Sequence, residues 1–126
     1  MIPDEYLQTF VIECRELLEQ MEAALLIVEL AADDPEIINA IFRAAHTIKG
    51  SAGMFGLDPI VAFTHVAESV LDRVRSGDLA ITSGLTALFF EVHDHLAVLV
   101  DHVADGNRSP TQLSQAAILS GTVDSS

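Results

Sequence analysis

One histidine lies in surroundings that suit nucleophilic phosphate chemistry. His46 is followed by Lys49 three residues later, by Gly50 after four and by Gly53 after seven. If the segment is helical, these positions share the side of His46. A neutral imidazole nitrogen can attack phosphorus, and a nearby ammonium can attract the phosphate. Lys49 is the only lysine in a chain with a formal net charge of −13. Together with Arg43, one turn before His46, it favours phosphate attraction.

The helix that must present His46 has an apolar face and a bare face. Apolar residues recur at steps of three and four, which predicts a core-facing stripe: Ile37, Ile41, Ala44, Ile48, Ala52 and Phe55. Glycine inside a helix costs roughly 1 kcal/mol relative to alanine. Such a cost makes sense if another protein must approach the exposed ring closely. We therefore expect a docking surface around His46, made of Ile38, Phe42, Arg43, Gly50, Gly53 and Met54.

Each of these features also has a simpler explanation. A lone exposed histidine usually has no catalytic role, and Arg43 and Lys49 could be ordinary solvated charges. Ile38 and Phe42 could tuck under the neighbouring helices at the flank of the fold instead of facing solvent.

The string AAHTIKGSAGMFGL, which begins at Ala44, resembles the active-histidine motif of histidine phosphotransfer (HPt) domains, in particular those of CheA-type chemotaxis kinases. The resemblance extends as a helix pattern over roughly residues 4–106. It is most specific in the spacing H-x-x-K-G-x-x-G-x-x-G. It implies that His46 accepts a phosphoryl group from an ATP-dependent kinase domain. His46 would then donate that group to an aspartate of a CheY-like response regulator.

The same resemblance implies partners for the imidazole on the neighbouring helix. Glu68 matches the position that accepts a hydrogen bond from one ring nitrogen, and His65 matches a further member of that network. A carboxylate at Nδ1–H would leave the Nε2 lone pair as the nucleophile. Without the resemblance, Glu68 would be a surface acid and His65 a half-buried helix residue.

Hydrophobic periodicity predicts four helices joined by short turns. We expect them from Asp4 to about Ala32, from Pro35 to about Phe55, from Asp58 to the stop at 76–77, and from residue 82 or 83 to about Ala104. Asp34 and Asp58, each followed by proline, are the expected caps of the second and third helices.

The fold class is therefore all-α, an antiparallel up-down four-helix bundle over residues 1–107. Residues 108–126 are expected to form a short fifth helix over 111–119 and a linker tail. On the third helix the expected core stripe is Phe63, Ala67, Val70 and Val74, with a second stripe of Val61, His65, Glu68 and Asp72 beside it.

Composition excludes several classes of function. The strong negative charge argues against nucleic acid and anionic membrane as partners. No uncharged apolar run of 18 residues is present, so we expect no membrane span or signal peptide, and a cytoplasmic protein. Cys14 is the single cysteine, expected to be a small buried hydrophobe. His93 and His95 fall on different helix faces, so no metal site is expected.

The predicted domain is a phosphoryl carrier, and its standing as an enzyme stays open. No nucleotide-binding motif is present, so ATP and Mg²⁺ would come from partner domains. Two alternatives remain. One is an acidic helical adaptor module without phosphate chemistry, and the other is an HPt domain of a non-chemotactic phosphorelay.

Overall fold

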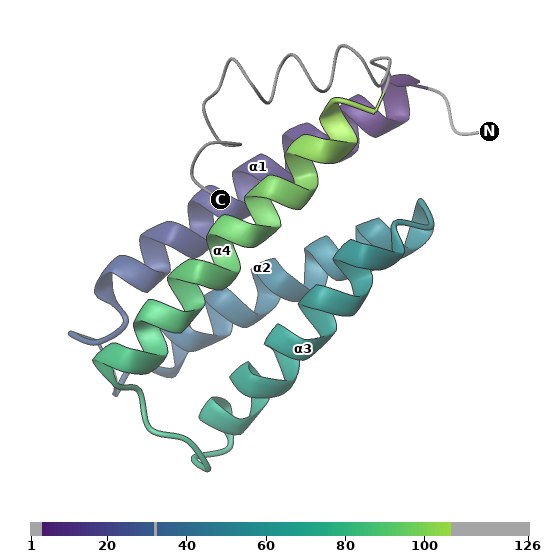
Figure 1. Cartoon of the computed structure of the whole chain (residues 1–126). Helices are drawn as coiled ribbons and strands as arrows, with labels where there is room; N and C mark the ends of the chain where they lie inside the picture. The colour runs from purple at the N-terminus through teal and green to yellow at the C-terminus, as the bar shows by residue number, and fades with distance from the viewer. Residues whose placement is uncertain (1–3, 32, 107–126) are drawn as a thin grey trace, which may run out of the picture.

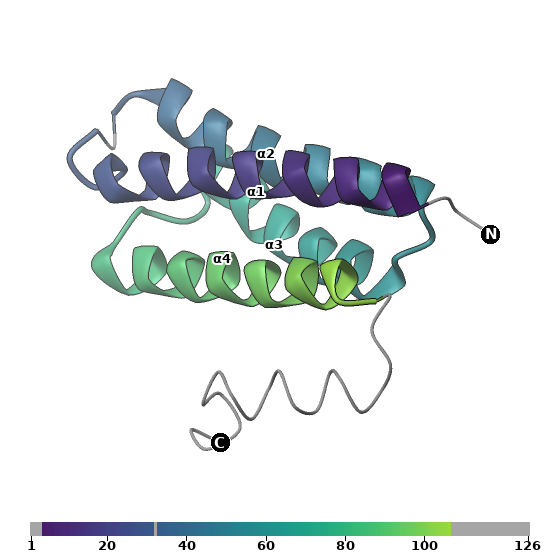
Figure 2. The same cartoon turned by 90° about the horizontal axis from the view of Figure 1, so that it is seen from above.

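The computed structural model describes residues 4–31 and 33–106, which form four helices and no strand. These are α1 (Asp4–Ile27), α2 (Pro35–Met54), α3 (Asp58–Arg75) and α4 (Ser83–Ala104). Consecutive helices run in opposite directions and lie side by side (Figures 1 and 2). Both α1 and α3 pack against α2 and α4, so the helices close into a four-membered ring. The predicted antiparallel up-down bundle is confirmed; the predicted fifth helix lies outside the described residues.

The core is built from apolar side chains of all four helices. Burial of such side chains stabilises the fold by roughly 1.5–3 kcal/mol each. The largest fully buried residues include Met21 on α1, Ile41 and Ile48 on α2, Ile60 and Leu71 on α3, and Leu96 and Val100 on α4. Cys14 is also buried, with 1% of its surface exposed. Burial, together with the charge of Glu13, raises the pKa of the Cys14 thiol to about 12, so Cys14 is not a nucleophile at neutral pH.

The ends of α2 match their sequence signals. The side chain of Asp34 accepts a hydrogen bond of 2.9 Å from the backbone N–H of Glu36, and Pro35 begins the helix. Gly56, two residues after the last helical residue, has a φ of +69°, a conformation that glycine adopts without strain. The helix that carries His46 therefore has fixed ends.

One predicted helix boundary and one predicted cap residue are wrong. The first helix ends at Ile27, earlier than expected, and residues 28–31 form a turn. Asp34 has an extended backbone, as expected for a residue that precedes a proline. Asp34 therefore cannot continue a helix, and residues 28–31 form the turn that reverses the direction of the chain before α2. Asp58 does not cap α3: Leu57 is the cap residue and makes no side-chain cap hydrogen bond. Asp58 lies in the first turn, where its charge favours the positive end of the helix.

The buried face of α3 is rotated from the predicted stripe. Phe63, Val70 and Val74 are only half-buried, whereas the buried residues are Ile60, Thr64, Ala67, Glu68 and Leu71. Thr64 can be buried because its hydroxyl donates a hydrogen bond of 2.6 Å to the carbonyl of Ile60. A pattern based on hydrophobic residues alone does not count Thr64 and Glu68 as buried, so the predicted core stripe of α3 lies one position away from the observed one.

Helix α4 is long and apolar enough to span a membrane by length and composition alone, with a mean hydropathy of 1.2 over its best window. Its Phe89, Leu96 and Val100 belong to the bundle core. Asp94 and Asp101 are exposed on the same helix. In this structure α4 therefore packs one face into the bundle core and exposes charged residues on another face.

Candidate functional site

His46 lies on the third turn of α2, on the flank where α3 packs. Its side chain is 62% exposed, whereas the Glu68 side chain that reaches it from α3 is 10% exposed. The Nδ1 atom of His46 lies 2.9 Å from Oε2 of Glu68. Oε1 of the same carboxyl lies 2.7 Å from Nζ of Lys49, one turn further along α2. One buried carboxyl of α3 thus holds two side chains of α2.

The charge state of Glu68 determines the protonation of the histidine. Burial alone would raise the pKa of Glu68, but hydrogen bonds and charge from Lys49 and His46 outweigh burial and lower it below 4.5. Glu68 is therefore a carboxylate at neutral pH and can only accept hydrogen bonds. His46 must donate its Nδ1–H to Glu68, so the neutral ring carries its lone pair on Nε2. No hydrogen bond from the described residues reaches Nε2.

Phe42 contacts the face of the histidine. Phe42 lies one turn before His46, and the two rings are nearly parallel, with an interplanar angle of 8° and 5.9 Å between centroids. The guanidinium carbon of Arg75, in the last turn of α3, lies 4.2 Å from the centroid of the Phe42 ring. Arg75 is not among the predicted site residues, because an arginine in the last turn of a helix is accounted for by the helix dipole alone.

The surface beyond His46 on α2 is open. Gly50 and Gly53 are exposed, and a Cβ added at either would meet nothing within 4 Å. Neither glycine is required by packing among the residues that the structure describes. Arg43 is exposed, and Met54 is 86% exposed at the end of the helix. All four residues are exposed, and their role in docking stays a prediction.

Two predicted site residues lie elsewhere. Ile38 is 9% exposed and belongs to the core, so its expected solvent-facing position is wrong. His65 is exposed and its side chain makes no hydrogen bond within the described residues, so it does not join the Glu68 network. Residues three apart on a helix differ by about 60° around the axis. That rotation turns His65 towards solvent while Glu68 points between α2 and α3.

The histidines of α4 are separate from this site and from each other. Nε2 of His93 lies 3.1 Å from the carbonyl oxygen of Leu18 on α1, whereas His95 contacts the ring of Phe63 on α3, with 4.5 Å between centroids. The expectation that these two side chains occupy different faces is confirmed. Among the described residues, no group of three or more His, Cys, Asp or Glu side chains is placed to hold a metal ion.

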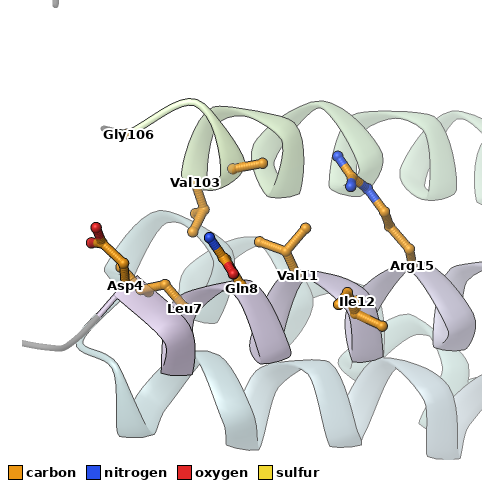
Figure 3. Close-up of a pocket in the computed structure, with 9 residues that line it drawn as sticks. Asp4, Leu7, Gln8, Val11, Ile12, Arg15, Val103 and Gly106 are labelled. Atoms are coloured by element: carbon orange, nitrogen blue, oxygen red, sulfur yellow. The ribbon is translucent and has the colours of Figure 1, made fainter. Parts of the chain in front are cut away.

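A hollow of about 330 Å³ lies away from His46, between the start of α1 and the end of α4 (Figure 3). It is lined by Asp4, Leu7, Gln8, Val11, Ile12, Arg15, Val103, Ala104 and Gly106. The Arg15 side chain extends towards α4, where it forms a 2.9 Å ion pair with Asp101. No residue of α2 or α3 lines this hollow, so it is not part of the histidine site.

Comparisons with known proteins agree with the geometry of the site. Residues 5–106 match the family described as the Hpt domain. The chemotaxis protein CheA of Rhizobium meliloti (strain 1021) is 43% identical over 103 residues, which cover 82% of this chain and 14% of that protein. The CheA of Bacillus subtilis (strain 168) is 35% identical over 114 residues, covering 90% of this chain and 17% of that protein. The chain thus spans less than a fifth of either relative.

Solved structures show the same architecture. The CheA phosphotransferase domain from Thermotoga maritima has a TM-score of 0.75 and 38% identity, over 79% of this chain and 95% of that one. The phosphorylated P1 domain of CheA3 in complex with CheY6 from R. sphaeroides has a TM-score of 0.75 at 24% identity, over 90% of each chain, which shows a common fold. The family match over most of the chain, together with these relatives, shows that the chain belongs to the Hpt domain family and is similar to the phosphotransfer domain of CheA.

Proposed function

We propose that His46 is a phosphoryl carrier that receives its phosphoryl group from a histidine kinase catalytic domain and passes it to a response regulator. The observation that carries the proposal is the contact of 2.9 Å between Nδ1 of His46 and the buried carboxylate of Glu68. This contact leaves Nε2 unprotonated and turned to solvent, which is the state that a nucleophile requires.

The proposed transfer balances as two displacements at phosphorus. The Nε2 lone pair forms an N–P bond with the γ-phosphorus of ATP, and ADP leaves with the electron pair of the broken P–O bond. The positive charge that develops on the ring lies beside the Glu68 carboxylate, which stabilises it. In the second step a carboxylate oxygen of the regulator attacks phosphorus, and the N–P electron pair returns to Nε2.

Lys49 acts first on Glu68 and then on the phosphate. Its ammonium lies 2.7 Å from Oε1 of Glu68, where it keeps the carboxyl ionised. The Lys49 side chain is still 25% exposed, and it lies on the side of His46. We propose that its charge also attracts the incoming phosphoryl group. This chain would supply the nucleophile (His46), the carboxylate that orients it (Glu68) and a cation near the phosphate (Lys49). ATP and Mg²⁺ would be held by the kinase domain.

A surface on α2 is proposed to seat the regulator. It comprises Arg43, Gly50, Gly53 and Met54, with Phe42 at its edge; Ile38 is excluded because it is buried. A relative with this fold, the R. sphaeroides CheA3 P1 domain, is known in complex with CheY6. We propose a CheY-like regulator for this chain as well, with its acidic phosphoacceptor pocket facing the cations of α2.

The relatives suggest the larger protein in which this domain works. The CheA proteins of R. meliloti and B. subtilis are several times longer than this chain. We propose that the domain belongs to a cytoplasmic CheA-like chemotaxis kinase, and that its partners include neither nucleic acid nor a membrane surface.

The proposal is tested by a labelling experiment with the full chain. Incubated with a CheA kinase catalytic domain, Mg²⁺ and γ-labelled ATP, the chain should acquire an acid-labile, base-stable label. Adding a CheY-like receiver should remove that label. His46→Gln should abolish labelling while the helical circular dichroism stays unchanged. Label on the His46→Gln chain would assign the site to another residue.

The same experiment separates the alternatives. An adaptor module without phosphate chemistry would acquire no label under any of these conditions. A domain from a non-chemotactic phosphorelay would acquire label but would transfer it faster to a different class of receiver than to a CheY-like one.

A further inference from the structure

The exposed imidazole of His46 is held by more than its hydrogen bond to Glu68. A single hydrogen bond at Nδ1 fixes one atom of the ring, and the ring can still rotate about that contact. The nearly parallel Phe42 ring, 5.9 Å away between centroids, restricts this rotation from one face. The position of Phe42 therefore bears on the direction in which Nε2 points.

Phe42 is in turn covered by Arg75. The Arg75 guanidinium lies 4.2 Å from the centroid of the Phe42 ring, within the distance of a cation–π contact. Among the described residues, the nearest carboxylate contact of Arg75 is long, at 3.9 Å to Asp72. The guanidinium therefore interacts mainly with the aromatic ring. This contact joins the last turn of α3 to the second turn of α2.

We propose that Arg75 is a positioning residue for transfer at His46, acting through Phe42. Arg75 holds the Phe42 ring, and Phe42 holds the plane of the imidazole whose Nδ1 is bound by Glu68. With the ring plane set by Phe42, which Arg75 holds, and the Nδ1 contact set by Glu68, Nε2 points in one direction before any partner binds. The inference rests on the proposed function of His46 and adds a residue that does not touch the phosphoryl group.

The chain provides a matched control for Arg75. Arg73 lies on the same helix turn, has the same charge and is exposed, but its side chain makes no ring contact or ion pair within the described residues. Charge steering would depend on both arginines, whereas positioning depends on Arg75 alone. Arg75→Lys keeps the charge and removes the planar guanidinium.

The first measurement is kinetic, with the full chain as substrate of a CheA kinase domain. Arg75→Ala should lower the maximal phosphorylation rate about 2- to 5-fold, the factor that corresponds to ~0.5–1 kcal/mol of exposed cation–π contact. The KM for the chain should stay unchanged, and Arg73→Ala should behave as wild type. Arg75→Lys should recover only part of the rate. Equal losses for Arg73→Ala and Arg75→Ala would assign both arginines to steering, and a change of Arg75→Ala confined to KM would assign Arg75 to kinase binding. Either result would overturn the proposal.

A double-mutant cycle tests whether Arg75 acts through Phe42. Phe42→Leu keeps an apolar side chain and removes the ring, so combining it with Arg75→Ala should lower the rate no further than Phe42→Leu alone. Additive losses would mean that the two residues act independently, against the proposal.

The second measurement does not depend on phosphorylation. The ring protons of His46 should shift in the NMR spectrum of Arg75→Ala and of Phe42→Leu, because the Phe42 ring current changes, and should not shift in Arg73→Ala. If the wild-type chain acquires no label, the proposed function fails, and these shifts still decide whether the stack exists. If the wild type is labelled and Arg75→Ala changes neither rate nor shifts, only the inference about Arg75 fails.

Discussion

Glu68 is the residue on which the site depends, and its environment differs from that of a surface acid. It is 8% exposed, and each of its carboxyl oxygens faces a different side chain of α2. A buried carboxylate without such partners would take up a proton. Lys49 and His46 therefore keep Glu68 ionised, and Glu68 in turn fixes the proton of His46.

The role of Lys49 can be measured directly at the Glu68 carboxyl. Lys49→Met removes the charge and hydrogen bond that lower the pKa of Glu68, while burial, which raises it, remains. The pKa of Glu68 should therefore be higher in Lys49→Met than in wild type, as followed by the ¹³Cδ shift in an NMR titration. Arg43→Met, which removes an exposed cation elsewhere on α2, should leave that pKa nearly unchanged. Equal pKa values in wild type and Lys49→Met would mean that the ion pair is not formed in solution.

Glu68 also links stability to pH. Because its folded pKa lies below the ordinary value of 4.5, the carboxylate contributes stability that is fully present above that pH. The contribution is lost as the pH falls through the folded pKa. The difference in unfolding free energy between wild type and Glu68→Gln, from urea titrations, should therefore shrink in acid. A difference that is constant across this range would show that the charge of Glu68 does not stabilise the fold.

The same carboxylate should matter more for transfer than for folding. Glu68→Ala should slow phosphorylation of His46 by on the order of 10–100-fold, as expected when a partner that orients a ligating or reacting imidazole is removed. Stopped-flow or quench measurements with the kinase domain would give this rate. Unchanged rates would mean that Glu68 does not orient the ring.

At the scale of one element, α2 combines a packed face with an open one. Its buried face includes Ile41, Ala44, Ile48 and Ala52, in agreement with the period of the sequence. Its open face carries His46, Gly50 and Gly53, and a Cβ added at either glycine would meet no atom of the described part of the chain within 4 Å. Gly50 and Gly53 thus lower the stability of α2, and both lie on the face where a partner is proposed to bind.

Substituting alanine for Gly50 or Gly53 should have opposite effects on the stability of the domain and on its docking to the regulator. Gly50→Ala and Gly53→Ala should each stabilise the free domain by about 0.5–1 kcal/mol, because glycine is the poorer helix former. Each should also slow transfer to the regulator, since the methyl group projects into the docking surface. Gly56→Ala is the control, with a φ of +69°, and should destabilise the domain. Faster or unchanged transfer in the first two variants would remove the glycines from the docking surface.

How far the sequence predicts the elements depends on what each residue contacts. The ends of α2 and α4 follow local signals at Asp34, Gly56 and Thr82, so they could be predicted. The buried face of α3 could not be predicted, because Thr64 and Glu68 are buried through hydrogen bonds and an ion pair that hydrophobicity does not register. Glu68 itself was found only through the resemblance of the chain to HPt domains.

Arg75 and Ile38 show the limit of helix-face arguments. A helical period places Ile38 on the side of His46, but α2 is covered by two neighbours and its buried face is wider than one stripe. The contact of Arg75 with Phe42 depends on the register of α3 against α2. Such a register is set by packing across the whole interface, so it cannot be predicted from the sequence of either helix alone.

The charged residues of the four helices are divided unequally between two halves of the bundle. Helices α2 and α3 carry acidic and basic side chains in equal number, namely Glu36, Asp58, Glu68 and Asp72 against Arg43, Lys49, Arg73 and Arg75. On α1 and α4 a single base, Arg15, accompanies the acids Asp4, Glu5, Glu13, Glu16, Glu19, Glu22, Glu91, Asp94 and Asp101. An acidic partner should therefore approach the histidine side of the bundle.

This division predicts which cation matters for association. Arg43→Glu should slow association with an acidic regulator by up to about 10-fold at low ionic strength, and the effect should fade as salt is added. Arg15→Glu, which changes the same charge on the acidic half, should have a much smaller effect. Stopped-flow fluorescence would measure the association rates. Equal effects of the two substitutions would mean that only the net charge, and not its position, steers the partner.

The central claim is that the phosphoryl group is carried by Nε2 of His46 while Nδ1 stays bound to Glu68. Long-range ¹H–¹⁵N correlation spectra of the ¹⁵N-labelled chain, recorded before and after phosphorylation by the kinase domain, assign both ring nitrogens. We expect the unphosphorylated ring to carry its proton on Nδ1, and the phosphorylated chain to show ³¹P coupling at Nε2 of His46. A phosphoryl group on Nδ1, or on any other histidine, would contradict the account.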